Sequence, residues 1–555
     1  MKVKVIISLL PLFFLLLFFY YPLFSVLRDA FLVEDTFTIS NFIRILSSPL
    51  EQRVILFTFY QAILSTYLTL VLGLPAAYLF GKYDFPGKEI IRSLITIPFV
   101  LPSIVVALGF IILFGENGIL PRIFSTITGI DISLDGFTLI LLAHAYYNAP
   151  IVIQMVSSSM ERMDPYLEEA AESLGDSGIH KFMYIFFPQI FPALVSSALL
   201  TFIFCFMSFT IVITLGGPQY RTIEVHLFSL YKVLFRKGEA AALAVLQLIT
   251  SLTFSYIYIK STESITKIER LGRVERARVE KIFSNIRDLI DIKKLFLVIY
   301  FIFLLAFFMF PIMSVVFSSF YDRVTNNFTL DGYLTLLSSV YSPCLGTSPQ
   351  RAIYNSLLYA IATMIGATLL GLLASYSTSR IKIPFRSLYS ALIIVPLGVS
   401  TITLSLGLVR SYLVSDFFYE NIWILILVAH ILVGFPFTMR AISNALERVD
   451  PDLIDAGRML GADDMHTFMK IDLPIIAPGI IVGGIFAFAI SIGEMAATLF
   501  LASPDYITIP VAMYSFISVR KYVVASAMGT ILILITFISF LVIRLFGEKQ
   551  IAGGF

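Results

Sequence analysis

Long apolar runs decide which solvent this chain can fold in. The sequence contains twelve runs of about 20 or more residues that carry few charged side chains. A run of that length crosses the ~30 Å hydrocarbon core of a bilayer as a helix, and lipid offers the backbone no hydrogen-bonding partner outside the helix. The sequence therefore predicts an all-α polytopic membrane protein with 12 transmembrane helices.

The twelve runs form two groups of six, separated by one long polar stretch. The first group lies at about residues 5–27, 55–80, 90–114, 137–159, 189–215 and 239–259. The second group lies at about residues 295–320, 352–378, 387–411, 422–445, 475–501 and 523–546. This arrangement predicts a first six-helix half at residues 1–260, a charged cytoplasmic linker at 261–293 and a second six-helix half at 294–555.

The composition agrees with a lipid environment. Of the residues, 58% are hydrophobic and 14% are charged, whereas soluble domains contain roughly 45–50% apolar and 25% charged residues. A formal net charge of +2 is no basis for nucleic-acid binding, and two cysteines cannot form a disulfide framework or a metal cluster. We therefore expect membrane lipid around the chain and neither nucleic acid nor a resident metal.

Positively charged residues in the short connections predict the orientation. Loops that carry Lys and Arg stay in the cytoplasm. Outside the linker, the N-terminus and alternate connections carry the residues used for this prediction: Lys2, Lys4, Lys82, Lys88, Arg92, Arg162, Lys181, Arg380, Lys382 and Arg386. The first apolar run is too long for the core of a signal peptide, so we expect it to remain as a helix. Both termini are predicted to be cytoplasmic.

An internal repeat relates the two halves. The segment from His144 to Pro192 matches the segment from His430 to Pro478 at a constant offset of 286 residues, and "ERMDPYLEEAAESLG" is paired with "ERVDPDLIDAGRMLG". Upstream of these segments the offset is 298, so the first half has 12 extra residues between its third and fourth spans. Because the copies share one topology, the halves are predicted to be parallel and related by an axis along the membrane normal.

The matched segment places a short docking helix on the cytoplasmic side of each half. The first copy contains Glu169, Ala170, Ala171 and Gly175, and the second contains Asp455, Ala456, Gly457 and Gly461. An Asp-Pro pair supplies a cap and a first-turn proline, the small residues permit close approach of a partner, and the last glycine ends the helix. Gly457 lowers the helix propensity of the second copy, so we expect the two docking sites to differ in strength.

This pattern of EAA, three residues, G and a later LP resembles the EAA loop of binding-protein-dependent ABC importer permeases. The fused chain with two such loops, together with "LGGPQYRTIEV" and "GEMAATLFLASPDYITIPVAMY", resembles the permeases for ferric iron and thiamine. The resemblance implies two ATP-binding cassette ATPase subunits, one docked on each segment, and an extracellular solute-binding protein.

The chain itself lacks the elements that hydrolyse ATP. No GxxxxGK loop followed by Ser or Thr occurs, and there is no HExxH or GxSxG motif. We therefore expect no catalytic, cofactor-binding or metal-binding residue here, with ATP bound by the partner subunit. The alternative is an ion-coupled secondary transporter with two six-helix halves, but the GxxxDRxGR-type loop of such carriers is replaced by "GKYDFPGKEIIR". A channel would leave the paired docking segments without a purpose.

One acidic residue lies inside a membrane run. Glu494 belongs to the fifth span of the second half, and its equivalent in the first half is Ser208. Because a carboxylate in hydrocarbon is costly, such residues are candidates for the translocation pathway, with a structural carboxylate as the alternative. His144 and His430 occupy equivalent positions inside the fourth spans, and for them we expect packing or hydrogen bonding and not metal ligation.

Overall fold

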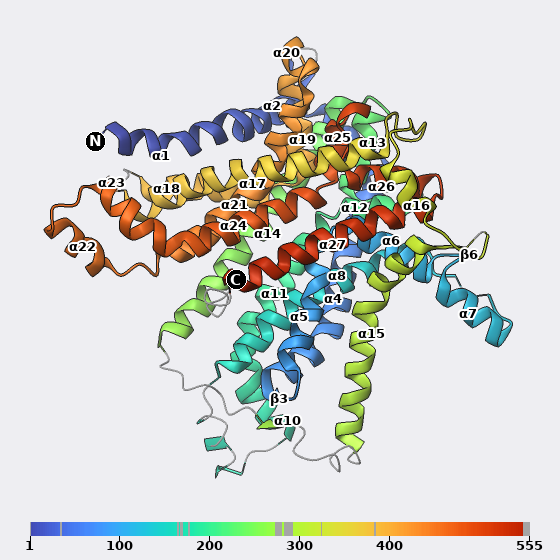
Figure 1. The fold of residues 1–555 in the computed structure, drawn as a ribbon, viewed down its shortest axis with the longest axis horizontal. Helices are drawn as coiled ribbons and strands as arrows, with labels where there is room; N and C mark the ends of the chain where they lie inside the picture. Colours follow the sequence, from blue (N-terminus) through green and yellow to red (C-terminus); the bar gives the residue numbers. More distant parts are fainter. Residues whose placement is uncertain are drawn as a thin grey trace.

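The computed structural model describes residues 2–33, 36–131, 133–163, 166, 170–171, 173–175, 178–271, 280–281, 292–323, 325–381 and 385–547. Over these residues the chain is almost entirely helical (Figure 1). Eleven of the described helices are long and apolar enough to cross a membrane. A twelfth span is a helix pair, Arg386–Gly398 and Thr401–Tyr412, bent by 103°. The predicted all-α fold with two six-helix repeats is confirmed.

The first half runs in chain order through α1 (Lys2–Leu15), the π-helix η1 (Leu16–Tyr20), α2 (Tyr21–Phe31), β1 (Leu32–Val33), β2 (Thr36–Phe37), α3 (Ser40–Ser47), α4 (Pro49–Lys82), β3 (Tyr83–Asp84), α5 (Lys88–Val100), α6 (Ser103–Phe114), α7 (Ile119–Thr128), α8 (Gly136–Glu161), α10 (Gly178–Lys181), the π-helix η2 (Phe182–Phe186), α11 (Phe187–Phe206), α12 (Thr210–Leu215), α13 (Ile223–Lys232) and α14 (Lys237–Leu271).

The second half repeats this order with β4 (Glu280–Lys281), α15 (Ile292–Phe320), β5 (Tyr321–Asp322), β6 (Asn327–Phe328), α16 (Asp331–Leu337), α17 (Pro349–Arg380), α18 (Arg386–Ile394), the 3-10 helix η4 (Val395–Gly398), α19 (Thr401–Tyr412), α20 (Asp416–Glu420), α21 (Ile422–Leu446), α22 (Pro451–Met459), α23 (Asp464–Thr467), the π-helix η5 (Phe468–Asp472), α24 (Leu473–Gly493), α25 (Ala496–Leu501), the 3-10 helix η6 (Pro504–Tyr506), α26 (Ile509–Ser518) and α27 (Tyr522–Gly547).

The repeat extends to the small elements between the spans. An antiparallel two-stranded hairpin follows the first span of each half, β1 with β2 and β5 with β6. The extra residues of the first half lie where α7 has 10 residues and its counterpart α20 has 5. Within the predicted linker, the helix α14 continues to Leu271, and the strand β4 pairs in parallel with β3 of the first half. The stretches 272–279 and 282–291 of the linker lie outside the described residues.

The first span of each half crosses over and packs on the third span of the other half. At one crossing, a Cβ added to Gly109 would lie 2.7 Å from the Pro311 carbonyl oxygen of α15. At the other, a Cβ added to Gly407 would lie 2.8 Å from the Pro22 carbonyl oxygen of α2. Only glycine leaves room for such an approach of two backbones. The two halves are therefore interlocked by a pair of symmetry-related contacts.

The third and fifth spans of both halves are interrupted, whereas the sequence analysis treated each of them as one run. The third span breaks between α5 and α6 in the first half and between η4 and α19 in the second. In the first half Leu101 and Pro102 are extended, since the residue before a proline disfavours helix. The fifth span breaks at Met207–Phe209 and at Glu494–Met495. Non-helical backbone at this depth is tolerated where protein or a wet cavity surrounds it.

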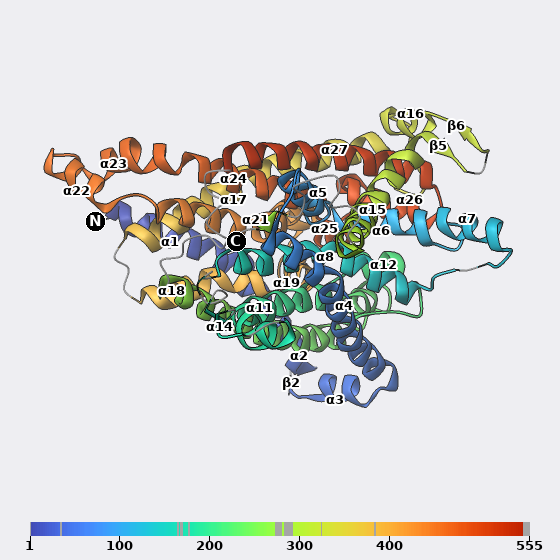
Figure 2. The ribbon, with the colours of Figure 1, turned by 90° about the horizontal axis from the view of Figure 1, so that it is seen from below.

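The two halves lie together at one end and apart at the other. In Figure 1, α22 and α23 of the second half lie at the left edge, and α10 of the first half lies near the bottom. On the opposite side α13 of the first half packs on α25 of the second, with the rings of Phe228 and Phe500 5.9 Å apart. Figure 2 shows the same long spread of α22 and α23 away from the packed body. The ends that carry the docking segments are thus the separated ends.

We predict that Gly407→Ala destabilises the protein by about 1–3 kcal/mol, because the new methyl group meets backbone atoms that cannot move aside. The measurement is the thermal unfolding midpoint in detergent. Gly366→Ala on α17 is the matched control, since its methyl group meets only the Ile431 side chain, with Cδ1 at 2.7 Å and Cγ1 at 3.2 Å. Equal midpoints for the two variants would contradict a tight crossing at Gly407.

Candidate docking segments and interior polar site

The second docking segment is a capped helix that ends at a glycine. The Asp450 side chain accepts a hydrogen bond of 2.9 Å from the Asp452 amide at the start of α22, and Pro451 occupies the first turn. Gly461 has a φ of +87°, a conformation that glycine adopts without strain. The Gly461 amide donates to the Arg458 carbonyl oxygen. The local sequence thus makes a short helix with defined ends.

One side of α22 anchors it to the membrane-spanning helices. Ile454 is buried with Ile442, Leu446, Val449 and Ile476 in an apolar cluster. Gly457 lies against the chain itself, because an added Cβ would lie 2.8 Å from Cδ1 of Ile471. Gly457 was predicted to permit close approach of a partner, but in this structure the Ile471 side chain lies against it. The rest of the helix, including Asp455 and Ala456, is exposed.

The first docking segment is described only in part. Glu169 lies outside the described residues. Ala170 is exposed, Ala171 is buried, and Gly175 has a φ of +83° like its counterpart Gly461. The two segments therefore end in the same left-handed turn, as the repeat predicts.

A leucine before each of these glycines is exposed to an unusual degree. Leu174 is 88% exposed and its equivalent Leu460 is 90% exposed. Neither side chain contributes to the packing of its own half, and both lie on the separated ends of the two halves. Sequence analysis did not single them out, although "LG" ends the matched segment in both copies. These leucines are the apolar tips of the two docking segments.

Beyond the Gly461 turn, a second cap starts α23. Asp463 accepts a hydrogen bond of 2.7 Å from the His466 backbone amide and one of 2.9 Å from the His466 ring. The bond from the backbone amide, followed by that from the ring, lowers the pKa of Asp463. His466 therefore fixes the exit of the docking segment and has a hydrogen-bonding role.

Glu494 lies at the break of the fifth span. It is half-buried, and its Oε1 accepts a hydrogen bond of 2.9 Å from the Ala497 amide, which caps α25. Its backbone amide donates to the Ser491 carbonyl oxygen at the end of α24. Ser208, the equivalent residue, lies at the break between α11 and α12. The structure thus places both predicted pathway residues where the fifth spans lose helical geometry.

Each fourth span carries a buried histidine that hydrogen-bonds to hydroxyl groups. In the second half, Nδ1 of His430 lies 2.8 Å from Ser491 Oγ and Nε2 lies 2.8 Å from Thr498 Oγ1. These hydroxyls flank the break that contains Glu494, so His430 ties its two sides together. In the first half, Nδ1 of His144 lies 3.0 Å from Ser65 Oγ. Hydrogen bonding was the expected role.

A second acidic residue reaches the interior, and sequence analysis missed it. Glu224 at the start of α13 is 2% exposed and accepts a 2.7 Å hydrogen bond from Gln247 Nε2. Glu224 lies close enough to Glu494 of the second half for the two carboxyl groups to repel each other when both are charged. The signal was absent because Glu224 lies in the largely polar stretch "PQYRTIEV" and reads as a loop residue. The interior site therefore contains one acidic residue from each half.

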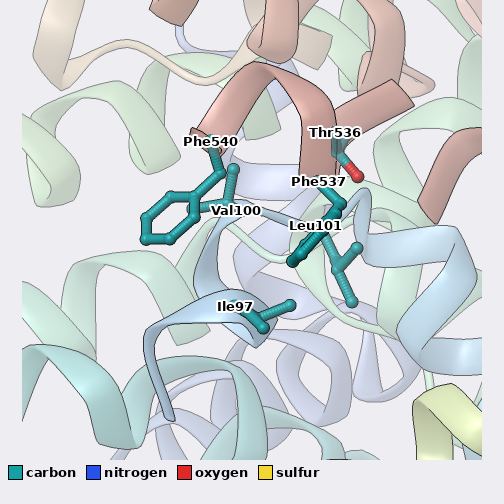
Figure 3. A pocket seen from close by; sticks show the side chains of 6 residues that line it. All are labelled: Ile97, Val100, Leu101, Thr536, Phe537 and Phe540. Atoms are coloured by element: carbon teal, nitrogen blue, oxygen red, sulfur yellow. The ribbon is translucent and has the colours of Figure 1, made fainter. Parts of the chain in front are cut away.

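A small pocket near this site is apolar. It lies between the break of the third span and α27, and it is lined by Ile97, Val100, Leu101, Thr536, Phe537 and Phe540 (Figure 3). Its one polar side chain offers a single hydroxyl group. Glu494 and Glu224 are not among its lining residues, so the pocket is separate from the polar site. Among the described residues, no group of three His, Cys, Asp or Glu side chains could hold a metal ion.

Comparison with protein families finds one match in each half of the chain. The family described as "Binding-protein-dependent transport system inner membrane component" matches residues 70–261 and 367–551. Together the two matches cover more than half of the chain, and each contains one docking segment and one broken fifth span.

Individual relatives match nearly the whole chain. The ferric transport system permease protein FbpB of Actinobacillus pleuropneumoniae is 25% identical over 96% of this chain and 77% of its own length. The thiamine transport system permease protein ThiP of Escherichia coli is 22% identical over 89% of this chain and 88% of its own length. The crystal structure of a bacterial ABC transporter involved in import of the acidic polysaccharide alginate aligns with 46% of this chain and 92% of that chain, at a TM-score of 0.40 and 14% identity.

We predict that Glu494→Ala lowers the free energy of unfolding by about 1 kcal/mol, because the Ala497 amide loses its capping acceptor. Glu494→Gln retains an acceptor oxygen and should unfold within a few tenths of a kcal/mol of the unchanged protein, about the cost of a surface substitution. Denaturant or thermal unfolding in detergent measures both. Equal stability of all three proteins would show that the cap contributes nothing.

Proposed function

Because the chain belongs to the family of binding-protein-dependent transport system inner membrane components, we propose that it imports a small solute, ferric iron or thiamine, delivered by an extracellular binding protein. It is a multi-pass inner membrane permease of the ABC importer class. In our proposal two ATPase subunits hydrolyse ATP on this chain's cytoplasmic side, and this chain forms the pathway.

One observation carries the proposal of two ATPase subunits. The two docking segments have matching ends, a left-handed glycine preceded by an almost fully exposed leucine, and they lie on the separated ends of the two halves. An apolar side chain that protrudes into water gains free energy when a partner covers it. Two equivalent apolar tips, far apart, are suited to two copies of one partner fold.

The arrangement of the halves supports alternating access. The halves are packed together at α13 and α25 and separated at the docking segments, so a solute pathway would be open toward the cytoplasm. Approach of the two ATPase subunits would draw the docking segments together. The interlocked crossings at Gly109 and Gly407 would then act as the pivots about which the other end opens.

The interior acidic residues support a cationic solute. Glu224 and Glu494 come from different halves and repel each other when both are charged, a repulsion that a cation between them would relieve. Two carboxyl groups at the interface of the halves would stabilise a passing cation. The relatives named as ferric iron and thiamine permeases agree with this choice. Uptake of radiolabelled ferric iron or thiamine into proteoliposomes, with the binding protein outside and ATP inside, tests the function, and ATP-independent uptake would contradict it.

We predict that Leu460→Asp weakens binding of the ATPase at least tenfold, because a charged side chain replaces the apolar tip in the buried contact. The permease itself should unfold as before, since Leu460 is 90% exposed. Surface-immobilised permease and purified ATPase give the affinity. Val414→Asp, which alters a 75% exposed residue between α19 and α20, is the control and should bind normally. Normal binding by Leu460→Asp would contradict the docking role.

We predict that Glu494→Gln reduces solute uptake severalfold while ATPase docking and basal ATP hydrolysis stay normal. The substitution retains the cap on α25 but removes the charge that a cation would meet. Initial rates of uptake in proteoliposomes measure the effect. Normal uptake by the Gln variant, with loss of assembly in Glu494→Ala, would make Glu494 structural and would remove this support for a cationic solute.

A further inference from the structure

Both docking segments join the fifth span through one turn of π-helix. The π-helices η2 (Phe182–Phe186) and η5 (Phe468–Asp472) lie at equivalent positions, because the repeat offset of 286 residues relates both ends of one to both ends of the other. Single π-turns inside helices are rare and occur frequently at functional sites. The two halves have limited sequence similarity, yet both have a π-turn at this position. The geometry where the docking segment joins the fifth span is therefore retained in both halves.

In the second half, residues at the C-terminal end of α17 contact this π-turn at both of its ends. The rings of Tyr376 and Phe468 meet edge to face at 5.1 Å, at the start of η5. Arg380 Nη2 lies 3.0 Å from Asp472 Oδ1, at the end of η5. The Asp472 side chain is 2% exposed and that of Arg380 is 20% exposed. We name these four residues the exit clamp.

The first half makes a different contact at the same place. By the repeat, Lys82 corresponds to Arg380 and Phe186 to Asp472. The Lys82 ammonium lies 5.3 Å from the centre of the Phe186 ring, and the Lys181 ammonium lies 5.6 Å from it. A cationic side chain on the second span thus contacts the last residue of the π-turn in both halves. That residue is a phenylalanine in the first half and an aspartate in the second. The contact is kept while its chemistry differs.

We propose that the exit clamp makes the second docking segment and the second span move as one rigid body, with Arg380 and Asp472 as positioning residues that carry the movement of the ATPase into the membrane. This inference rests on the proposed function. The chain leads from α22 directly into α21, the fourth span, and through a widened turn into α24, the fifth span. The clamp adds a direct route into α17, which contacts α21 and α24 along much of its length.

The buried ion pair suits this task better than apolar packing. A charged pair with little solvent exposure resists separation, because pulling the partners apart leaves an uncompensated charge in a low-dielectric environment. Apolar side chains slide past one another at small cost, whereas an Arg–carboxylate contact has a preferred geometry. The clamp should therefore hold its shape when the docking segment is pushed.

The test measures the distance between the docking segment and the second span in the complete permease–ATPase complex in lipid. Spin labels are placed at Met465→Cys on α23 and Leu369→Cys on α17, both exposed, in a chain whose Cys205 and Cys344 are replaced by Ser. A second pair, Met183→Cys and Met469→Cys at equivalent positions in the two halves, reports closure between the halves. Distances are recorded before and after trapping with ATP and vanadate.

With the clamp intact, trapping should shorten the distance between the halves and leave the Met465–Leu369 distance unchanged. Asp472→Asn should let that distance shift or broaden on trapping, although the ATPase still binds. Arg351→Gln is the matched control, since it breaks a 3.1 Å ion pair with Asp505 at the other end of α17 and should behave like the intact chain.

If Asp472→Asn does not fold, the pair of changes Arg380→Lys and Asp472→Phe supplies the contact of the first half and should keep the distance fixed.

Two results would overturn the inference. A Met465–Leu369 distance that changes on trapping in the intact chain would show that the docking segment slides over α17. A distance that stays fixed in Asp472→Asn would show that the ion pair is not required. If trapping leaves the distance between the halves unchanged in every variant, the proposed function fails, and the role of the clamp fails with it.

Discussion

The architecture depends on the reciprocal crossing of the first spans. Gly109 receives the backbone of Pro311, and Gly407 receives the backbone of Pro22, so each half contributes a helix to the body of the other. In a bilayer, helices gain little from burying apolar side chains, and close backbone contact at small residues supplies much of the association energy. Because the two contacts are related by the repeat, the halves are held together at two equivalent points within the spans. The docking segments lie away from these points and are left free to separate and approach.

Interruption of the third and fifth spans creates the polar interior. Two straight six-helix bundles would present continuous apolar surfaces to each other. The breaks instead bring backbone ends, the Glu494 cap and the His430 hydrogen bonds into the region where the halves meet. The fold therefore provides polar groups at the interface without exposing backbone to lipid, which is the arrangement that transporter folds use for solute sites.

The sequence predicted the class, the number of spans and the repeat, because these follow from long-range patterns of apolar residues. It also placed the docking segments, since the Asp-Pro start and the Gly461 stop are local signals. The sequence did not predict that the fifth spans are interrupted, because Glu494 and Ser208 lie in runs that remain apolar on both sides. Glu224 was missed for the opposite reason: its surroundings are polar enough to read as a loop, and only the tertiary fold brings α13 inside. The swapped crossings at Gly109 and Gly407 are likewise invisible until both halves are placed together.

The central claim is that each half docks one ATPase subunit, and the stoichiometry of the assembled complex tests it most directly. Mass measurement of the complex released from lipid, with the permease present as one chain, gives the number of ATPase subunits bound. The structure predicts two subunits per chain, one for each exposed leucine before a left-handed glycine. A complex that is active with one ATPase subunit, or with none, would contradict the account.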